Sequence, residues 1–282
     1  MTPQAETVRD LLVAAERTLA GVEGARLDAE CLLRRVIDVE RSWLYAHPGA
    51  AIDPSLACDF RLLVRRRGEG CPVAYLTGEK EFWSMPFLVN RHTLIPRPET
   101  ELLVESALEL HRDSRSLDML DLGTGCGAIA VALASERPDC RITASDISRE
   151  ALGVAQMNAQ RLGCPDIEFL LADWFSGFGS RRFDVILCNP PYVDSADAAL
   201  HAPGVRFEPR LALDGGHGGI QAINLIVAGA ARHLPAEGLL LLEHGSDQGE
   251  HVRRLLAMGG FRNVRTLKDC AGLERISIAQ CP

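Results

Sequence analysis

The segment Asn189-Pro190-Pro191-Tyr192 combines residue types that can hold a planar amino group. It follows the apolar run "DVILC". A residue before proline is extended, and prolines donate no backbone hydrogen bond, so the segment is rich in carbonyl acceptors. The Asn189 side chain adds an acceptor and Tyr192 adds a flat ring. A strand followed by a proline turn explains Pro190 and Pro191, but it does not explain Asn189.

A second segment, "DLGTGCG" from Asp121 to Gly127, has alternating glycines. Gly123, Gly125 and Gly127 let the backbone turn tightly and approach a ligand closely. The spacing is G-x-G-x-G, without the G-x-x-G end of the dinucleotide-binding fingerprint. Taken alone, a glycine-rich turn without a ligand explains this segment equally well.

Acidic residues follow two further apolar runs. Asp146 ends "RITASDI", near the place where an acid binds ribose hydroxyls in nucleotide-binding folds. Its alternative role as a helix cap is weaker because Ser148 is available as the cap. Asp173 and Trp174 follow "IEFLL" and offer a carboxylate and an indole that fit an adenine, although a core tryptophan beside a solvated acid is the alternative. The four features together predict a ligand site at the carboxyl ends of parallel strands.

The elements that position these residues alternate between strands and helices from residue 96 onward. This order indicates an α/β fold with a parallel sheet covered by helices on both faces. The last two strands are too close for a crossover helix, so they should pair antiparallel. The strands are expected at "LDMLDLG", "RITASDI", "IEFLLAD", "FDVILCN", "LLLLEHG", "NVRTLKD" and "ERISIAQ". The helices are expected at 128–136, 148–162, 220–233 and 248–258.

The first part of the chain is helical in its periodicity. Apolar residues recur at three-and-four spacing, and Asp53-Pro54 predicts the start of a helix that ends near Gly68. The next stretch, "GEKEFWSMPFLVNRHTLIP", is typical of a β-hairpin. We therefore expect an N-terminal helical domain at 1–75, a hairpin linker at 76–95 and an α/β domain at 96–282.

The amino-acid composition and net charge of the chain disfavour several classes of protein. The chain has 282 residues, 47% apolar and 24% charged, which indicates a globular protein. No apolar run is long enough to span a bilayer and the N-terminus lacks the features of a signal peptide, so we expect a cytoplasmic protein with no membrane partner. The nine cysteines are scattered singly and none of the eight histidines has a convincing partner, so no metal site is expected. The net charge of −8 disfavours DNA or RNA as substrate.

With these motifs the chain resembles a known family. "DLGTGCG", Asp146, Asp173-Trp174 and "NPPY" resemble class I S-adenosylmethionine-dependent methyltransferases that act on planar nitrogen. The stretches "PVAYLTGEKEFW", "IPRPETE" and "FEPRLALDGGHGG" resemble, more narrowly, the PrmC/HemK protein-(glutamine-N5) methyltransferases, which modify the GGQ glutamine of bacterial peptide-chain release factors. The resemblance covers essentially the whole chain. It implies a Rossmann-like seven-stranded sheet whose last strand is antiparallel, preceded by a small helical domain that recognises the substrate.

The resemblance also implies roles for single residues. The cofactor would be S-adenosylmethionine, with S-adenosylhomocysteine as the product. Asn189 and the Pro190 carbonyl would accept the two amide hydrogens of the substrate glutamine, with Pro191 and Tyr192 beside it. The segments 97–101 and 207–219 would border the pocket in roles left open. The cofactor-binding residues would be Asp121, Leu122, Gly123, Thr124, Gly125, Gly127, Asp146, Ile147, Asp173, Trp174 and Asn189.

Two other functions share part of this pattern. An amino-methyltransferase acting on a DNA or RNA base also contains "NPPY", but it should show a basic face, and the only run of that kind is Arg65-Arg66-Arg67. A non-catalytic protein that binds S-adenosylmethionine would have no need of an intact Asn189. Release factor is therefore the expected partner.

Overall fold

The computed structural model describes residues 6–112 and 116–282 and divides into two compact units. The first unit runs to Glu79 and also includes Pro203–Phe207, and the second comprises Lys80–Ala202 and Glu208–Pro282. The boundary falls within the segment that the sequence indicates as a hairpin. The grouping of Pro203–Phe207 with the first unit brings together residues far apart in the sequence.

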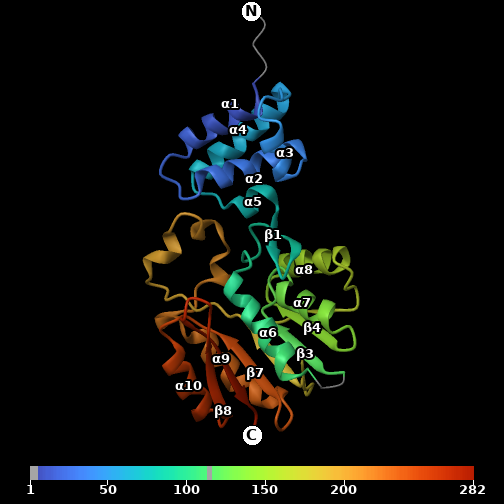
Figure 1. The fold of residues 1–282 in the computed structure, drawn as a ribbon. Helices are drawn as coiled ribbons and strands as arrows, with labels where there is room; N and C mark the ends of the chain where they lie inside the picture. The colour runs from blue at the N-terminus through green and yellow to red at the C-terminus, as the bar shows by residue number, and fades with distance from the viewer. Residues whose placement is uncertain (1–5, 113–115) are drawn as a thin grey trace, which may run out of the picture. The chain divides into compact units, whose positions relative to one another are not determined.

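The first unit is built from helices that bury a shared apolar core (Figure 1). Asp53 caps the fourth helix with Pro54 in its first turn, as the sequence predicts. Thr7 caps the first helix through a capping box with Asp10. The sequence pattern did not indicate the short third and fifth helices. The helices are α1 (Val8–Thr18), α2 (Ala25–Ile37), α3 (Arg41–Ala46), α4 (Pro54–Gly68) and α5 (Val73–Thr77).

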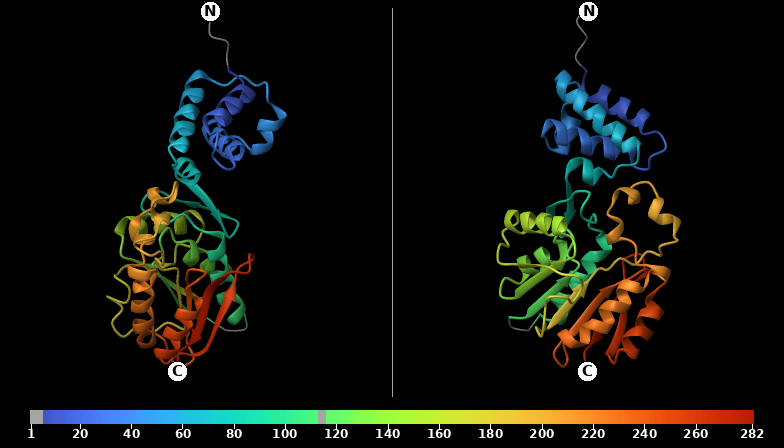
Figure 2. Two further views of the ribbon diagram at one scale, coloured as in Figure 1. Left: turned by 90° about the vertical axis from the view of Figure 1, so that its left-hand side faces the viewer. Right: turned by 180° about the vertical axis from the view of Figure 1, so that it is seen from behind.

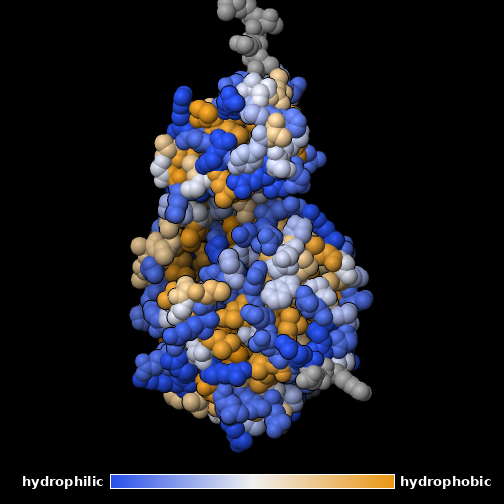
Figure 3. Space-filling model, viewed as in Figure 1, coloured by the Kyte–Doolittle hydropathy of each residue, from blue (hydrophilic) through white to orange (hydrophobic). Residues whose placement is uncertain are grey.

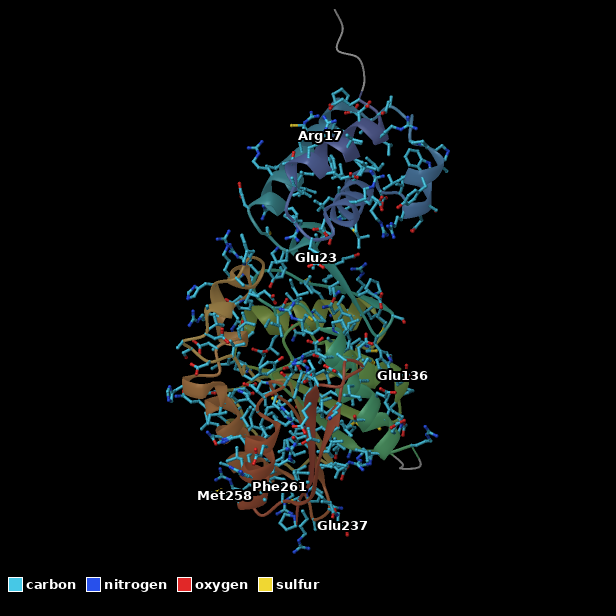
Figure 4. All side chains as sticks on the ribbon, turned by 60° about the vertical axis from the view of Figure 1, so that its left-hand side comes forward. Arg17, Glu23, Glu136, Glu237, Met258 and Phe261 are labelled. Atoms are coloured by element: carbon cyan, nitrogen blue, oxygen red, sulfur yellow. The ribbon has the colours of Figure 1, made fainter. Side chains whose placement is uncertain are left out.

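A hairpin of β1 (Glu79–Phe82) and β2 (Met85–Leu88) follows, as predicted. Its turn places Trp83 and Ser84 in the left-handed region, with φ of 52° and 57°. The Trp83 backbone N–H donates to Glu101 at 2.8 Å, and its indole N–H donates to Glu136, labelled in Figure 4, also at 2.8 Å. These two hydrogen bonds fasten the turn to Glu101 and Glu136 of the same unit and stabilise a conformation that non-glycine residues rarely adopt.

The second unit contains a seven-stranded sheet of order β5-β4-β3-β6-β7-β9-β8. Strands β3 to β7 are parallel, and β9 runs antiparallel to both of its neighbours. The prediction of seven strands with an antiparallel last strand is confirmed. The strands are β3 (Asp118–Leu122), β4 (Arg141–Asp146), β5 (Glu168–Leu171), β6 (Val185–Cys188), β7 (Leu239–Glu243), β8 (Arg262–Lys268) and β9 (Glu274–Gln280).

Helices cover both faces of this sheet (Figure 2). Helices α6 (Glu101–Leu110), α7 (Ala128–Glu136) and α8 (Arg149–Arg161) lie on one face, and α9 (Gln221–His233) and α10 (Gly249–Met258) lie on the other. The observed ends of α7 to α10 agree with the predicted ones to within one residue. Alternate residues of β3, β6 and β7 pack against α9 and α10 in a continuous core.

The connection between β6 and α9 has no long helix. It contains short 3₁₀ turns at Ala198–His201, Val205–Phe207, Arg210–Ala212 and His217–Gly219, none of which the sequence pattern indicates as an element. Hydrophilic residues cover most of the face shown in Figure 3, with small hydrophobic patches between them. Within residues 6–112 and 116–282, no helix is long and apolar enough to cross a membrane.

Candidate functional site

The carboxyl ends of β3, β4, β5 and β6 open onto one pocket of about 720 Å³ within the second unit. This is the edge at which the sequence predicts a ligand site. The structure brings most of the expected residues to its wall. Those residues are Leu122, Gly123, Gly125, Asp146, Ile147, Asp173, Trp174, Asn189 and Pro191.

Asp146 connects the glycine loop to the end of β4. One carboxylate oxygen accepts a hydrogen bond from the Gly125 N–H at 2.9 Å, and the other accepts from the Ser148 N–H at 2.8 Å. Burial raises the pKa of Asp146, and these backbone bonds oppose that effect. Ser148 caps α8, as the sequence predicts, by accepting from the Ala151 N–H. The Asp146 carboxylate thus shapes the loop and also borders the pocket.

The glycines of the loop have conformations that other residues rarely adopt. Gly123, Gly125 and Gly127 have φ of 79°, 57° and 85°. A Cβ on Gly127 would lie 3.1 Å from the Ala155 Cβ of helix α8. Glycine is therefore required here by backbone conformation and, at Gly127, by close packing of the loop against a helix.

Asp121 lies behind the pocket wall, although the sequence places it among the cofactor contacts. Its Oδ2 accepts from the Thr124 hydroxyl at 2.6 Å and from the Ala130 N–H at 3.1 Å, while Oδ1 has no hydrogen-bond partner among the described residues. Burial raises the pKa of Asp121 to about 7. Neither Asp121, Thr124 nor Gly127 lines the pocket, and any direct contact between them and a cofactor stays a prediction.

Trp174 stands on a strained backbone, with φ of 46°. An aromatic residue rarely adopts this left-handed conformation, and such strain is concentrated at functional sites. The turn is held by two hydrogen bonds between Asp173 and Ser176, which are 2.9 and 3.0 Å long. Asp173 is exposed and Trp174 is half-buried, so both a carboxylate and an indole border the pocket.

Asn189 is half-buried at the end of β6 and has a defined amide orientation. Its Nδ2 donates to the Thr100 Oγ1 at 3.0 Å. The amide oxygen is therefore the end left to accept from a ligand. Thr100 belongs to the segment 97–101, whose role the sequence left open.

Tyr192 is tied to an acid that the sequence reasoning missed. Its hydroxyl donates to Glu243 Oε1 at 3.2 Å. Burial raises the pKa of Glu243 to about 7 against the opposing effects of Thr100 and Tyr192, and burial followed by the Glu243 charge raises the pKa of Tyr192 well above its ordinary value. Glu243 is the last residue of β7, so the only sequence signal was an acid at the end of the run "LLLLE".

The segment 207–219 supports the backbone of the Asn189–Tyr192 loop. The Val193 N–H donates to the Leu213 carbonyl at 2.9 Å, and the Gly215 N–H donates to the Val193 carbonyl at 2.8 Å. A Cβ on Gly219 would lie 2.1 Å from the Tyr192 carbonyl oxygen, a distance no side chain tolerates. Glycine at this position therefore lets the two backbones touch. Pro190 is buried in this arrangement and does not line the pocket.

Glu208 joins the two border segments. It is buried, and its carboxylate accepts from Arg97 Nη2 at 2.5 Å and from the Ile95 N–H at 3.0 Å. Both segments, whose roles the sequence left open, thus form hydrogen bonds with the Asn189–Val193 loop. Within residues 6–112 and 116–282, no cluster of three or more His, Cys, Asp or Glu residues could hold a metal ion.

Comparison of the sequence with protein families gives two matches. Residues 10–78 match the PrmC N-terminal domain, and residues 98–203 match the Methyltransferase small domain. Several relatives are each named release factor glutamine methyltransferase. The Pseudomonas aeruginosa protein is 49% identical, and the match covers 91% of this chain and 92% of that protein. The Shewanella oneidensis protein is 45% identical, with 93% of this chain and 91% of that protein covered. The Escherichia coli protein is 43% identical, with 93% of this chain and 94% of that protein covered.

Solved structures resemble about 70% of this chain in fold. A Thermus thermophilus 16S rRNA methyltransferase in complex with AdoMet and guanosine has a TM-score of 0.53 at 19% identity, covering 72% of this chain and 50% of that one. A Pyrococcus furiosus methyltransferase has a TM-score of 0.51 at 20% identity, covering 69% and 87%. At these identities the likeness establishes the class I methyltransferase fold.

Proposed function

Because this chain belongs to the release factor glutamine methyltransferases, we propose that it transfers a methyl group from S-adenosylmethionine to the GGQ glutamine of bacterial release factors. The observation that carries this proposal is the orientation of Asn189. Asn189 lines the pocket and its Nδ2 donates to Thr100, which leaves the amide oxygen to accept from a substrate amide.

The pocket residues fit the proposed cofactor. Asp146 would accept hydrogen bonds from the ribose hydroxyls, and Ile147 and Trp174 would cover the adenine. The backbone at Gly123 and Gly125, which carries no Cβ, would leave room for the methionine part. When bound, S-adenosylmethionine supplies an electrophilic methyl group on a sulfonium.

The protein's task is to present a poor nucleophile. The lone pair of an amide nitrogen is delocalised into the carbonyl group, so an amide attacks weakly. Acceptors that take the amide hydrogens, Asn189 Oδ1 and the Pro190 carbonyl, raise the electron density on the nitrogen. Alignment with the methyl group then contributes up to about 7–11 kcal/mol, the range for well-oriented reactants.

The proposed methyl transfer requires no strong base. The nitrogen–carbon bond forms as the carbon–sulfur bond breaks, and the electron pair of the broken bond stays on sulfur, giving S-adenosylhomocysteine. The methylated nitrogen is acidic until it loses its proton to a neighbouring acceptor or to water. Burial raises the pKa of Tyr192 well above its ordinary value, so Tyr192 stays protonated throughout and acts as a packing surface.

The first unit would select the substrate. A glutamine side chain is too small and too common to identify a protein, so discrimination requires contacts away from the reacting amide. The helical unit has its own core and is matched by the PrmC N-terminal domain, which supports this role. A cytoplasmic location is proposed together with this function, because release factors act in translation.

The test is to incubate the protein with labelled S-adenosylmethionine and, separately, release factor, DNA and RNA. We expect label in release factor alone, on the GGQ glutamine by mass spectrometry. A release factor with asparagine in place of that glutamine is the matched control and should remain unlabelled. Label in DNA or RNA instead would support the alternative base amino-methyltransferase.

A further inference from the structure

Glu243 is a buried carboxyl group to which the proposed mechanism gives no part. It has no exposed surface, it ends β7, and its Oε2 has no hydrogen-bond partner among the described residues. A carboxyl buried without a cationic partner costs stability, and an apolar side chain would avoid that cost. Its position therefore calls for a reason other than stability.

Two neighbours of Glu243, Tyr192 and Thr100, connect it with the substrate loop. The Tyr192 hydroxyl donates to its Oε1 at 3.2 Å. The Thr100 oxygen accepts from Asn189 Nδ2 at 3.0 Å, and its hydroxyl group opposes the rise in the pKa of Glu243. Tyr192 is thus hydrogen-bonded to an acid on a neighbouring strand, and Asn189 is hydrogen-bonded to Thr100, while Glu243 Oε2 remains free to accept the Thr100 hydroxyl hydrogen.

The direction of these bonds decides which end of the Asn189 amide faces the pocket. An asparagine amide has nearly the same shape when it is rotated by half a turn, so only its hydrogen bonds distinguish the two orientations. Thr100 has a single hydroxyl hydrogen. If Glu243 takes that hydrogen, the Thr100 oxygen can only accept, and Asn189 must offer Nδ2 to it. In the reverse orientation Nδ2 would meet the N–H groups of the substrate, donor against donor.

We propose that Glu243 is a positioning residue for the methyl transfer: through Thr100 it fixes the amide orientation of Asn189, and directly it fixes Tyr192. This inference rests on the proposed function. Glu243 itself touches neither the substrate nor the cofactor in this arrangement, since it lies behind the pocket wall.

Two substitutions at Thr100 separate positioning from packing. Thr100→Val keeps the shape of the side chain and removes the hydroxyl, whereas Thr100→Ser keeps the hydroxyl and removes a methyl group. We expect Thr100→Val to lower kcat by about 50-fold or more, and Thr100→Ser to stay within about five-fold of the wild type. A packing role predicts the opposite order. Cofactor affinity by calorimetry should change by no more than about two-fold in either variant.

A double-mutant cycle tests whether the effect passes through Asn189. In an Asn189→Ala background, Thr100→Val should cause almost no further loss of kcat, because the residue it orients is gone. Glu243→Gln should retain more activity than Glu243→Leu, because glutamine can still accept hydrogen bonds from Tyr192 and Thr100. Thermal unfolding of each full-length variant establishes that it is folded before its kinetics are compared.

The outcomes are distinguishable. Transfer to release factor by the wild type, with Thr100→Val at least as active as Thr100→Ser, overturns the positioning role and leaves the proposed function standing. A full additional loss from Thr100→Val in the Asn189→Ala background also overturns it. Absence of any transfer to release factor by the wild-type chain overturns the proposed function, and the inference with it.

Discussion

Two buried glutamates, one in each unit, differ in their hydrogen-bond partners and in the direction of their pKa shifts. Glu30 in the helical unit is 1% exposed; its Oε1 accepts from Arg26 at 2.6 Å and its Oε2 from Arg41 at 2.8 Å, with Tyr45 bonded to both oxygens. Burial raises its pKa, but these bonds outweigh burial and leave the pKa below its ordinary value. At Glu243 burial prevails, and the pKa rises to about 7.

Glu30 has the environment of a group that stabilises the fold, whereas Glu243 has the environment of a group that contributes to a site. Every oxygen of Glu30 is paired with cations or a hydroxyl, so it links α2 to the segment around α3. Glu243 and Asp121 each leave one oxygen without a hydrogen bond in the described structure, and both lie beside the pocket wall. Buried polar atoms normally form hydrogen bonds, and places where they do not are often functional sites.

Among the substitutions that leave Asn189 in place, the largest expected effect comes from Gly219→Ala. The added Cβ would lie 2.1 Å from the Tyr192 carbonyl oxygen, so the Asn189–Tyr192 backbone must shift. A shift of about 1 Å at the reacting groups lowers activity by about 100-fold. The measurement is methyl transfer to release factor.

Gly218→Ala is the matched control for that change. Gly218 has a similar φ of 67°, but its Cβ would meet only Ile220 Cγ1, at 3.8 Å. It should keep much more activity than Gly219→Ala. Equal losses in the two variants would show that backbone strain, and not contact with the loop, explains the effect.

Asp146→Ala should weaken S-adenosylmethionine binding by about 1–3 kcal/mol, because ribose hydroxyls and the Gly125 N–H lose their acceptor. Calorimetry gives this value directly. Asp184→Ala is the control: that carboxylate also accepts one backbone N–H, from Asp118 at 2.9 Å, but at the opposite ends of the strands. Unchanged affinity in Asp146→Ala would remove Asp146 from the site.

Glu30→Gln should lower the free energy of unfolding by about 1–3 kcal/mol at pH 7, because two arginines lose a charged partner. Glu243→Gln should change it by less than about 1 kcal/mol, since no cation loses its partner there. Urea unfolding of the full chain measures both. A larger loss in Glu243→Gln would contradict the division between the two glutamates.

The pH dependence of stability should run in opposite directions for these two acids. The lowered pKa of Glu30 gives stability that is present above its ordinary pKa and lost as the pH falls. The raised pKa of Glu243 means that the folded state binds the extra proton, so this contribution is lost as the pH rises from about 4.5 through 7. Glu243→Gln should therefore gain stability relative to the wild type between pH 5 and 8. If the difference in unfolding free energy between Glu243→Gln and the wild type does not change with pH, the pKa of Glu243 is not raised.

Patterns local in the sequence predicted much of the fold. The period of apolar residues, the caps at Asp53 and Ser148 and the short gap before the last strand predicted elements that the structure contains. Contacts between distant segments were not predictable in this way. Thr100 lies in the segment 97–101, whose role the sequence left open, and Glu243 lies in an expected strand. Only the fold brings them to the loop: β6 and β7 are neighbours, which places Glu243 beside Tyr192, and Thr100 bonds to Asn189.

The central claim, that Asn189 presents the substrate amide and does not merely end a strand, is tested most directly by Asn189→Ala. With saturating S-adenosylmethionine and release factor, mass spectrometry of the GGQ glutamine should show a rate about 1,000-fold or more below that of the wild type, while calorimetry shows cofactor affinity within about three-fold. A folded Asn189→Ala variant that methylates the glutamine at a near-normal rate would contradict the account.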